Sequence, residues 1–213
     1  MVQERERLVL RVLLQHGYGV LEGVRAFEAG CSAGHNLLQL LQWGARPEDL
    51  AAIDVDPSFV AYCRARTPGI RVHEGSAEAI PEPGASFDLS LAFTLFSSVR
   101  EERVSAAIAA ELVRITKPGG LILVYDMRRR SPRNPAVQPV TAEDIRRWFP
   151  RCPLRTHTTT LAPPLARPLG RFAPFLYAPL AALPPLRTHA LHVLRCPGEG
   201  SWRSPMVESP PRN

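Results

Sequence analysis

The chain has 213 residues, of which 45% are hydrophobic and 22% are charged. A chain of this length and composition buries a core unaided, which excludes a disordered or collagen-like protein for most of its length. Its formal net charge of +6 is unevenly distributed. Residues 1–126 carry 12 basic and 16 acidic side chains, whereas residues 127–213 carry 14 and 4. The basic second part indicates an anionic partner or, because the chain has a single lysine, a coding bias toward arginine.

The four cysteines are far apart in sequence and form no C-x-x-C pair, which predicts neither a zinc site nor a dense disulfide framework. The apolar run 8–14 is broken by Arg11 and does not fit a secretory signal. The most apolar stretch, 162–183, contains two arginines and five prolines, so it is a poor membrane span. We therefore expect a cytoplasmic protein with reduced thiols, no membrane span and no metal site.

The first 126 residues alternate between strand-like and helix-like segments. Residues 5–15 place Leu8, Val9, Val12 and Leu13 on one helix face. Strands are expected at 24–29, 51–55, 69–73, 87–93 and 121–125. Further helices are expected at 35–43, from Pro57 with an apolar face of Phe59, Val60 and Cys63, and at 101–115. The stretch Lys117–Gly120 is expected to end the last of these helices. This alternation predicts a doubly wound, mostly parallel α/β sheet with helices on both faces.

The second part differs in character. Residues 128–134 form a polar link, and Thr141 is an N-cap candidate for a helix with Ile145, Trp148 and Phe149 on one face. Strands at 154–161 and 189–194 complete a seven-stranded sheet with a C-terminal antiparallel hairpin. The domain prediction is a single domain over 1–196, with a cofactor-binding half (1–126), an acceptor-side half (127–196) and a flexible tail over 197–213. A proline-broken segment, 163–185, is expected to cover the acceptor pocket or to pack on the sheet edge.

A glycine turn after the first strand is the first place to expect a ligand. Gly30 allows a tight bend, Gly34 lets the next helix approach, and Asp54 ends the second strand, where a carboxylate accepts ribose hydroxyls. The pattern indicates a nucleoside-containing cofactor. A dinucleotide is disfavoured because no glycine lies between Gly30 and Gly34. A hydrolase with Ser32 as nucleophile fits the G-x-S-x-G pattern, but the elbow follows the first strand and leaves no sheet to carry an oxyanion hole.

Several motifs resemble those of the class I S-adenosylmethionine-dependent methyltransferases. Residues 28–34 are similar to their E-x-G-x-G-x-G loop, 52–57 to their second-strand acid motif, 74–77 to their adenine loop, 86–94 to their fourth-strand motif and 112–121 to their lead into the fifth strand. The resemblance covers about residues 8–196 and implies S-adenosyl-L-methionine as cofactor. It implies a binding site made of Glu28, Gly30, Cys31, Gly34, Asp54, Val55, Ser76, Ala77, Ala92, Phe93 and Thr94.

By the same resemblance, Glu28 and Gly30 hold the methionine end, Asp54 the ribose, and Ser76 and Ala77 the adenine. Two residues depart from the family pattern. Ser32 replaces a loop glycine, which is feasible if its φ is negative. Ser76 replaces a frequent aspartate, so its hydrogen bond to adenine is neutral and weaker.

The predicted function is methyl transfer to a small-molecule acceptor. Such a transfer is an in-line displacement, and its catalysis can come from aligning and desolvating the reacting pair. Thr94, Tyr125, Asp126, Arg128 and Asn134 lie near the expected acceptor rim. Asp126 is interpreted as a cap or an ion-pair partner in preference to a base, and no catalytic residue is assigned. The arginines at 128–130 suggest an anionic acceptor; nucleic acid is disfavoured because aromatic residues do not alternate with the arginines. The second hypothesis is a non-catalytic nucleoside-binding module of the same fold.

Overall fold

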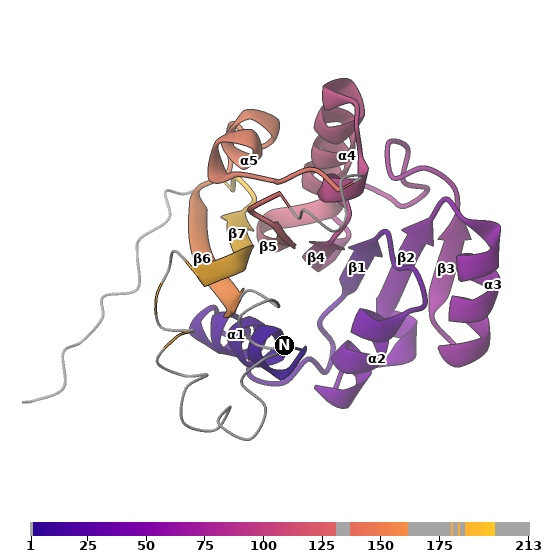
Figure 1. Cartoon of the computed structure of the whole chain (residues 1–213). Helices are drawn as coiled ribbons and strands as arrows, with labels where there is room; N and C mark the ends of the chain where they lie inside the picture. The colour runs from indigo at the N-terminus through magenta and orange to yellow at the C-terminus, as the bar shows by residue number, and fades with distance from the viewer. Residues whose placement is uncertain (1, 131–136, 162–179, 181–182, 184–185, 199–213) are drawn as a thin grey trace, which may run out of the picture.

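The computed structural model describes residues 2–130, 137–161, 180, 183 and 186–198 (Figure 1). Its strands are β1 (Ala26–Ala29), β2 (Leu50–Asp54), β3 (Arg71–Glu74), β4 (Phe87–Phe93), β5 (Thr116–Met127), β6 (Leu154–Leu161) and β7 (Arg187–Arg195). Its α-helices are α1 (Val2–Gln15), α2 (His35–Gln42), α3 (Pro57–Arg66), α4 (Glu102–Ile115) and α5 (Ala142–Trp148), with short 3₁₀ turns at Pro47–Asp49 and Phe96–Ser98.

The strands form one seven-stranded sheet in the order β3-β2-β1-β4-β5-β7-β6. Strands β1 to β5 pair in parallel, whereas β7 lies antiparallel to both β5 and β6. The predicted doubly wound sheet with a C-terminal antiparallel hairpin is therefore confirmed. The chain order reverses between β1 and β4, and this switch point is where a parallel sheet leaves a crevice at the strand ends.

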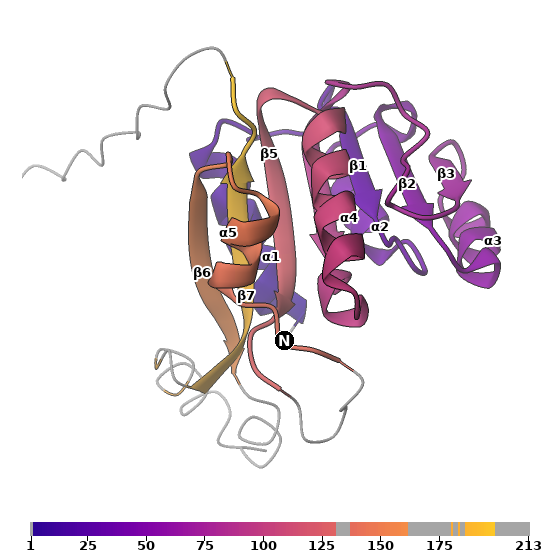
Figure 2. The same ribbon diagram turned by 90° about the horizontal axis from the view of Figure 1, so that it is seen from above.

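Helices cover both faces of the sheet (Figure 2). Apolar side chains of α1, α2 and α3 pack on one face, and those of α4 and α5 pack on the other, which gives two core clusters separated by the sheet. The strand interiors are apolar on both sides because both faces are covered. In β1 all four residues are buried, including the carboxyl-bearing Glu28.

Two helix starts follow the sequence signals. Asp56 caps α3 by accepting hydrogen bonds from the backbone N–H groups of Ser58 and Phe59, and Pro57 occupies the first turn. Thr141 and Asp144 form a reciprocal capping box at the start of α5, as the N-cap prediction required. On α3, however, Phe59 is 44% exposed. Since α3 buries only the narrow stripe of Val60 and Cys63, the expected apolar face was too wide.

The stretch Lys117–Gly120 lies inside β5 and does not separate it from α4. Phe87 pairs with Thr116, but Leu89 pairs with Leu121, so the extra residues form an irregularity in the strand. The expected cover at 163–185 and the tail at 197–213 lie largely outside the described residues, as does Asn134. The domain division stays a prediction. Over the described ranges, no helix is both long and apolar enough to cross a membrane.

His192 on β7 gives the fold a pH dependence. Its side chain is 1% exposed, Nδ1 lies 3.0 Å from Thr156 Oγ1, and burial, with a smaller effect of Arg146, lowers its pKa to about 4; the nearby Asp144 opposes this. The unfolded chain therefore takes up a proton near pH 6.5, which the folded protein does not accept until about pH 4. We expect this residue alone to remove about 3 kcal/mol of stability as the pH falls through that interval.

The measurement is the free energy of unfolding of wild type and of His192→Gln between pH 4 and 7.5. The difference between the two proteins isolates His192 from carboxyl groups that titrate in the same range. A difference that stays constant with pH would contradict the prediction.

Candidate functional site

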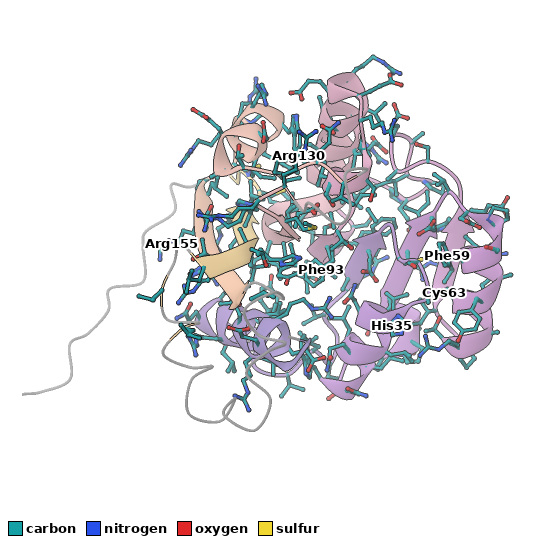
Figure 3. The ribbon with its side chains drawn as sticks, viewed as in Figure 1. His35, Phe59, Cys63, Phe93, Arg130 and Arg155 are labelled. Carbon is teal, nitrogen blue, oxygen red and sulfur yellow. The ribbon has the colours of Figure 1, made fainter. Side chains whose placement is uncertain are left out.

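A pocket of about 570 Å³ lies at the switch point between β1 and β4. Its wall includes the Gly30 loop and one side of α2 along its whole length, together with Arg5 and Glu6 from α1, Arg66 from α3, and Phe93 and Thr94 from the end of β4. Figure 3 shows Phe93 between α1 and the sheet, with His35 on α2 and Cys63 on α3 to one side. The pocket therefore combines elements from residues 5 to 94.

The Gly30 loop needs glycine at both ends. Gly30 and Gly34 have φ values of 71° and 74°, in the left-handed region. A Cβ on Gly30 would lie 2.9 Å from Leu95 Cδ1, and one on Gly34 would lie 2.8 Å from Cys63 Sγ. The two glycines thus permit both the backbone conformation and the approach of neighbouring side chains.

Ser32 corrects one expectation. Its φ is 46°, so this serine holds a left-handed conformation where a negative value was required. A hydrogen bond stabilises that strained conformation, because the Ser32 N–H donates to Asp54 Oδ2 at 2.7 Å. Among the described residues the Ser32 hydroxyl makes no hydrogen bond to a histidine, which removes the geometric basis for the hydrolase hypothesis.

Gly34→Ala should destabilise the protein by roughly 1–3 kcal/mol, because a left-handed alanine is strained and its Cβ would clash with Cys63. The control is Gly17→Ala, since Gly17 has a φ of 87° but nothing within 4 Å of an added Cβ. Chemical denaturation of both variants separates clash from backbone strain. Equal losses of stability would show that the contact with Cys63 contributes nothing.

Asp54 connects the end of β2 to the Gly30 loop. Besides the Ser32 N–H, its carboxylate accepts a hydrogen bond from the Asp56 N–H at 3.1 Å, on Oδ1. Val55, the next residue, is 68% exposed although it is a large aliphatic side chain. The exposed side chain of Val55 thus lies next to a carboxylate, and each oxygen of that carboxylate can accept a further hydrogen bond.

Glu28 is the most unusual group at the site. Its side chain is 0% exposed, and Asn36, which lines the pocket, donates to Oε1. Oε2 has no hydrogen-bond partner among the described residues. Burial raises the pKa of Glu28 to about 8. A buried carboxyl oxygen without a partner is costly, so this oxygen is a candidate acceptor for a donor outside the described residues, such as a water or a ligand.

The remaining predicted site residues lie at the same edge of the sheet. Ser76 follows β3, is exposed, and donates from Oγ to Glu78 Oε2 at 3.2 Å; Ala77 beside it is buried. Ala92 and Phe93 are buried at the end of β4, and Thr94 is exposed with a φ of 55°. These positions are brought to one edge by the parallel pairing of β3, β2, β1 and β4, but their roles in binding stay predictions.

Asp126 has a structural role, as its interpretation as a cap anticipated. It is 0% exposed, and its carboxylate accepts hydrogen bonds from the Ser97 N–H at 3.0 Å and the Met127 N–H at 2.9 Å. Burial raises its pKa despite these bonds. The carboxylate therefore fixes the turn after β4 to the end of β5.

Sequence reasoning missed several contributors to the site. Arg5 and Asn36 line the pocket, although neither was given a role. Cys31 and Cys63, 32 positions apart, lie close enough for each thiol to shift the pKa of the other. The glycine turn offered a signal for Asn36, because helix α2 begins there, but no local pattern indicates Arg5 or the proximity of the two thiols.

Comparisons with known proteins agree with this geometry. Residues 26–120 match the family described as a methyltransferase domain. The ubiquinone biosynthesis O-methyltransferase of Azorhizobium caulinodans is 31% identical over 135 residues, which cover 62% of this chain and 51% of the relative. The one from Rhizobium etli is also 31% identical, over 62% of this chain and 52% of the relative. The chain thus spans about half the length of these curated relatives.

Solved structures show the same fold at low identity. The N-methyltransferase NodS from Bradyrhizobium japonicum superposes with a TM-score of 0.63 at 17% identity, covering 91% of this chain and 96% of the other. The [4+2]-cyclase SpnF gives 0.62 at 20% identity, over 91% and 82%. The fold is that of the class I S-adenosylmethionine-dependent methyltransferases, and residues 26–120 match a methyltransferase domain. S-adenosyl-L-methionine is the cofactor of that class.

Proposed function

We propose that this protein transfers the methyl group of S-adenosyl-L-methionine to a small-molecule acceptor. The observation that carries the proposal is the buried Glu28 carboxyl, whose Oε2 lacks a partner next to the glycine loop at the switch point. The names of the matched relatives, which are O-methyltransferases of ubiquinone biosynthesis, support a small acceptor and an oxygen nucleophile. The cytoplasmic location stays a prediction.

The residues present fit this cofactor. Asp54 would accept the ribose hydroxyls, the exposed Val55 would contact the adenine with Ser76 and Ala77, and Glu28 would accept from the methionine ammonium. When bound, the cofactor supplies a methyl group on a sulfonium, which a nucleophile displaces in line. The chain's own contribution is to hold that group at the crevice, because a carboxylate at each end of the ligand fixes its direction.

The acceptor side is apolar next to the pocket. The rings of Phe93 and Tyr125 lie 5.8 Å apart at the ends of β4 and β5, and both residues are 6% exposed. A wall of this kind excludes water from a reacting pair. Because both Asp126 oxygens accept backbone hydrogen bonds, we assign it no role as a base. The anionic character of the acceptor, suggested by the arginines at 128–130, stays a hypothesis.

The test is a calorimetric titration with S-adenosyl-L-methionine and with S-adenosylhomocysteine, followed by transfer of a radiolabelled methyl group to a panel of phenols and carboxylic acids. We expect micromolar binding of both ligands. If neither binds at high micromolar concentration, the proposal fails.

A second candidate is a nucleoside-binding protein of the same fold that does not transfer a methyl group. The observation in its favour is the fold shared with a cyclase, SpnF, because that similarity shows that this architecture also occurs in a protein named for other chemistry. Serines at positions 32 and 76 are compatible with it. Cofactor binding without methyl transfer to any tested acceptor would favour this candidate.

A further inference from the structure

A row of rings crosses the sheet at the ends of β4, β5 and β7. Phe93, which lines the pocket, has its ring centroid 5.8 Å from that of Tyr125. Tyr125 in turn stacks on the half-buried His189, with the centroids 5.2 Å apart and an angle of 4° between the planes. His189 pairs with Met127 in the register of β5 and β7, so it lies beyond Tyr125 toward the carboxyl end of β5. The row therefore carries an imidazole on the acceptor side, where the proposed transfer otherwise has no base.

Hydrogen bonds to Thr160 and Thr188 fix the orientation of these rings. Thr160 has a left-handed φ of 66°, which strains a β-branched residue. Its hydroxyl oxygen lies 2.9 Å from the Tyr125 hydroxyl, and its carbonyl oxygen accepts from the Thr188 hydroxyl at 3.2 Å. The same Thr188 oxygen lies 3.0 Å from His189 Nδ1. One network thus connects the tyrosine and the histidine of the row.

This network assigns one tautomer to His189. The Thr188 hydroxyl has a single hydrogen, which it donates to the Thr160 carbonyl oxygen, so His189 Nδ1 supplies the hydrogen of its own contact with Thr188. A neutral imidazole with its proton on Nδ1 has a lone pair on Nε2. Among the residues that the structure describes, no hydrogen bond reaches this Nε2. The ring therefore presents an atom that can take up a proton.

The surroundings of His189 keep the imidazole neutral at pH 7. Burial lowers its pKa below the usual value near 6.5, and Arg5 on α1 lowers it further. The guanidinium carbon of Arg5 lies 5.7 Å from the Tyr125 ring centroid, next to His189 in the row. The other charged or titratable groups on the neighbouring elements are Glu4 on α1, Asp126 and Arg128 on β5, His157 on β6 and Arg187 on β7.

We infer that His189 is the general base of the methyl transfer and that the acceptor is a phenol. The inference rests on the proposed function and names the substrate class of the same site. Nε2 takes the proton of the phenolic hydroxyl while an electron pair of the oxygen forms the bond to the methyl carbon. The bond from that carbon to sulfur breaks, and its electron pair stays on the sulfur. The products are an aryl methyl ether, S-adenosylhomocysteine and an imidazolium, which releases its proton to water.

The chemistry of the base selects this acceptor class. A phenol has a pKa near 10, so an imidazole can remove its proton as the new bond forms, whereas an alkanol is too weak an acid. A carboxylic acid is already ionised at pH 7 and needs no base. The rings of Phe93 and Tyr125 also suit a flat aromatic acceptor.

The first measurement does not depend on catalysis. Nitrogen NMR of the protein with isotopically labelled histidine reads the tautomer of each ring, and the signal that is missing in His189→Gln identifies His189. We expect the Nδ1–H form in wild type at pH 7.5. Thr188→Val removes the hydroxyl and should raise the share of the Nε2–H form, whereas Thr188→Ser should keep the wild-type ratio. A proton on Nε2 in wild type would overturn the inference and leave the proposed function intact.

The second measurement is methyl transfer to the panel of phenols and carboxylic acids. His189→Gln should lower kcat on phenols about 100- to 10,000-fold and leave the affinity for S-adenosylhomocysteine within about twofold. The wild-type rate should level off above pH 7, whereas the rate of the variant should keep rising toward pH 10 as the phenol itself ionises. The matched control is His157→Gln, a half-buried histidine on β6 near His16 and Arg11, which should keep the wild-type kcat.

Three results would overturn the inference while the proposed function stands. They are wild-type kcat on phenols in His189→Gln, an equal loss of kcat in His157→Gln, and transfer by wild type to carboxylic acids alone. Failure of wild type to bind S-adenosyl-L-methionine and S-adenosylhomocysteine would instead overturn the proposed function and this inference together.

Discussion

Replacing Asp54 by alanine should weaken the binding of S-adenosylhomocysteine by about 10- to 150-fold, which corresponds to about 1.5–3 kcal/mol. The loss has two sources. The variant removes the carboxylate that would accept the ribose hydroxyls, and it frees the Ser32 N–H, which lies 2.7 Å from Asp54 Oδ2. Because Ser32 holds a left-handed φ of 46°, the loop loses a bond that stabilises its strained residue.

The neighbouring Asp56 provides the control. Its carboxylate accepts from the Ser58 N–H at 2.8 Å as the N-cap of α3. Asp56→Ala should therefore lower stability, because α3 loses its N-cap, and leave ligand affinity within about twofold. Calorimetric titration and chemical denaturation of both variants give the two readouts. If Asp54→Ala binds the ligand as tightly as wild type, Asp54 is not part of the site.

Much of the sheet was predictable because its strands are buried on both faces. The fourth strand, 87–93, was predicted with its observed bounds, and the run 121–125 lies within β5. Continuous apolar runs separated by glycine and proline turns leave few alternatives to a parallel sheet with helical crossovers. The site edge followed from the same pattern, since parallel strands bring the residues after β1, β2, β3 and β4 together.

What could not be predicted depends on the packing of distant segments. The polar neighbour of Glu28, Asn36, and the pocket position of Arg5 follow from how α1 and α2 lie on the sheet, which local periodicity does not specify. The φ of Ser32 depends on its bond to Asp54, 22 residues away. The exposure of Phe59 reflects the narrow contact of α3 with the sheet, because side-chain hydrophobicity alone does not fix how wide a buried stripe is.

The acidic first part of the chain also has a structural explanation. Several of its carboxylates serve the fold: Asp88 accepts from Lys117 Nζ at 2.7 Å, Glu111 pairs with Arg114, and Glu82 with His73. Glu28 and Asp54 are exceptions, because each accepts a hydrogen bond from a residue that lines the pocket, Asn36 and Ser32 respectively. Some of the acidic residues thus form ion pairs within or between elements, and two carry carboxyl groups in or at the end of β1 and β2.

Cofactor binding should release close to one proton from Glu28 at pH 7. In the free protein burial raises the pKa of this carboxyl to about 8, so Glu28 is about nine-tenths protonated at pH 7. A bound ammonium next to Oε2 favours the carboxylate, and the proton leaves as the ligand enters. Affinity should therefore rise with pH, by at most about tenfold per pH unit, and stop rising near pH 8.

The raised pKa also affects the stability of the free protein. The contribution of Glu28 to stability is fully present below pH 4.5 and is lost as the pH rises through 8.

The proton is counted by titrating S-adenosylhomocysteine at pH 7 in two buffers with different ionisation enthalpies. The range is kept to pH 6–7.5, because the α-amino group of the ligand itself titrates near pH 8. Glu28→Gln keeps the size of the side chain and cannot ionise, so it should bind about 10- to 100-fold more weakly at pH 7.5, with no proton release from this position. The prediction fails if wild type releases no net proton on binding the ligand and binds it with the same affinity at pH 6 and 7.5. That result would show that Glu28 does not accept a hydrogen bond from the ammonium group of the ligand.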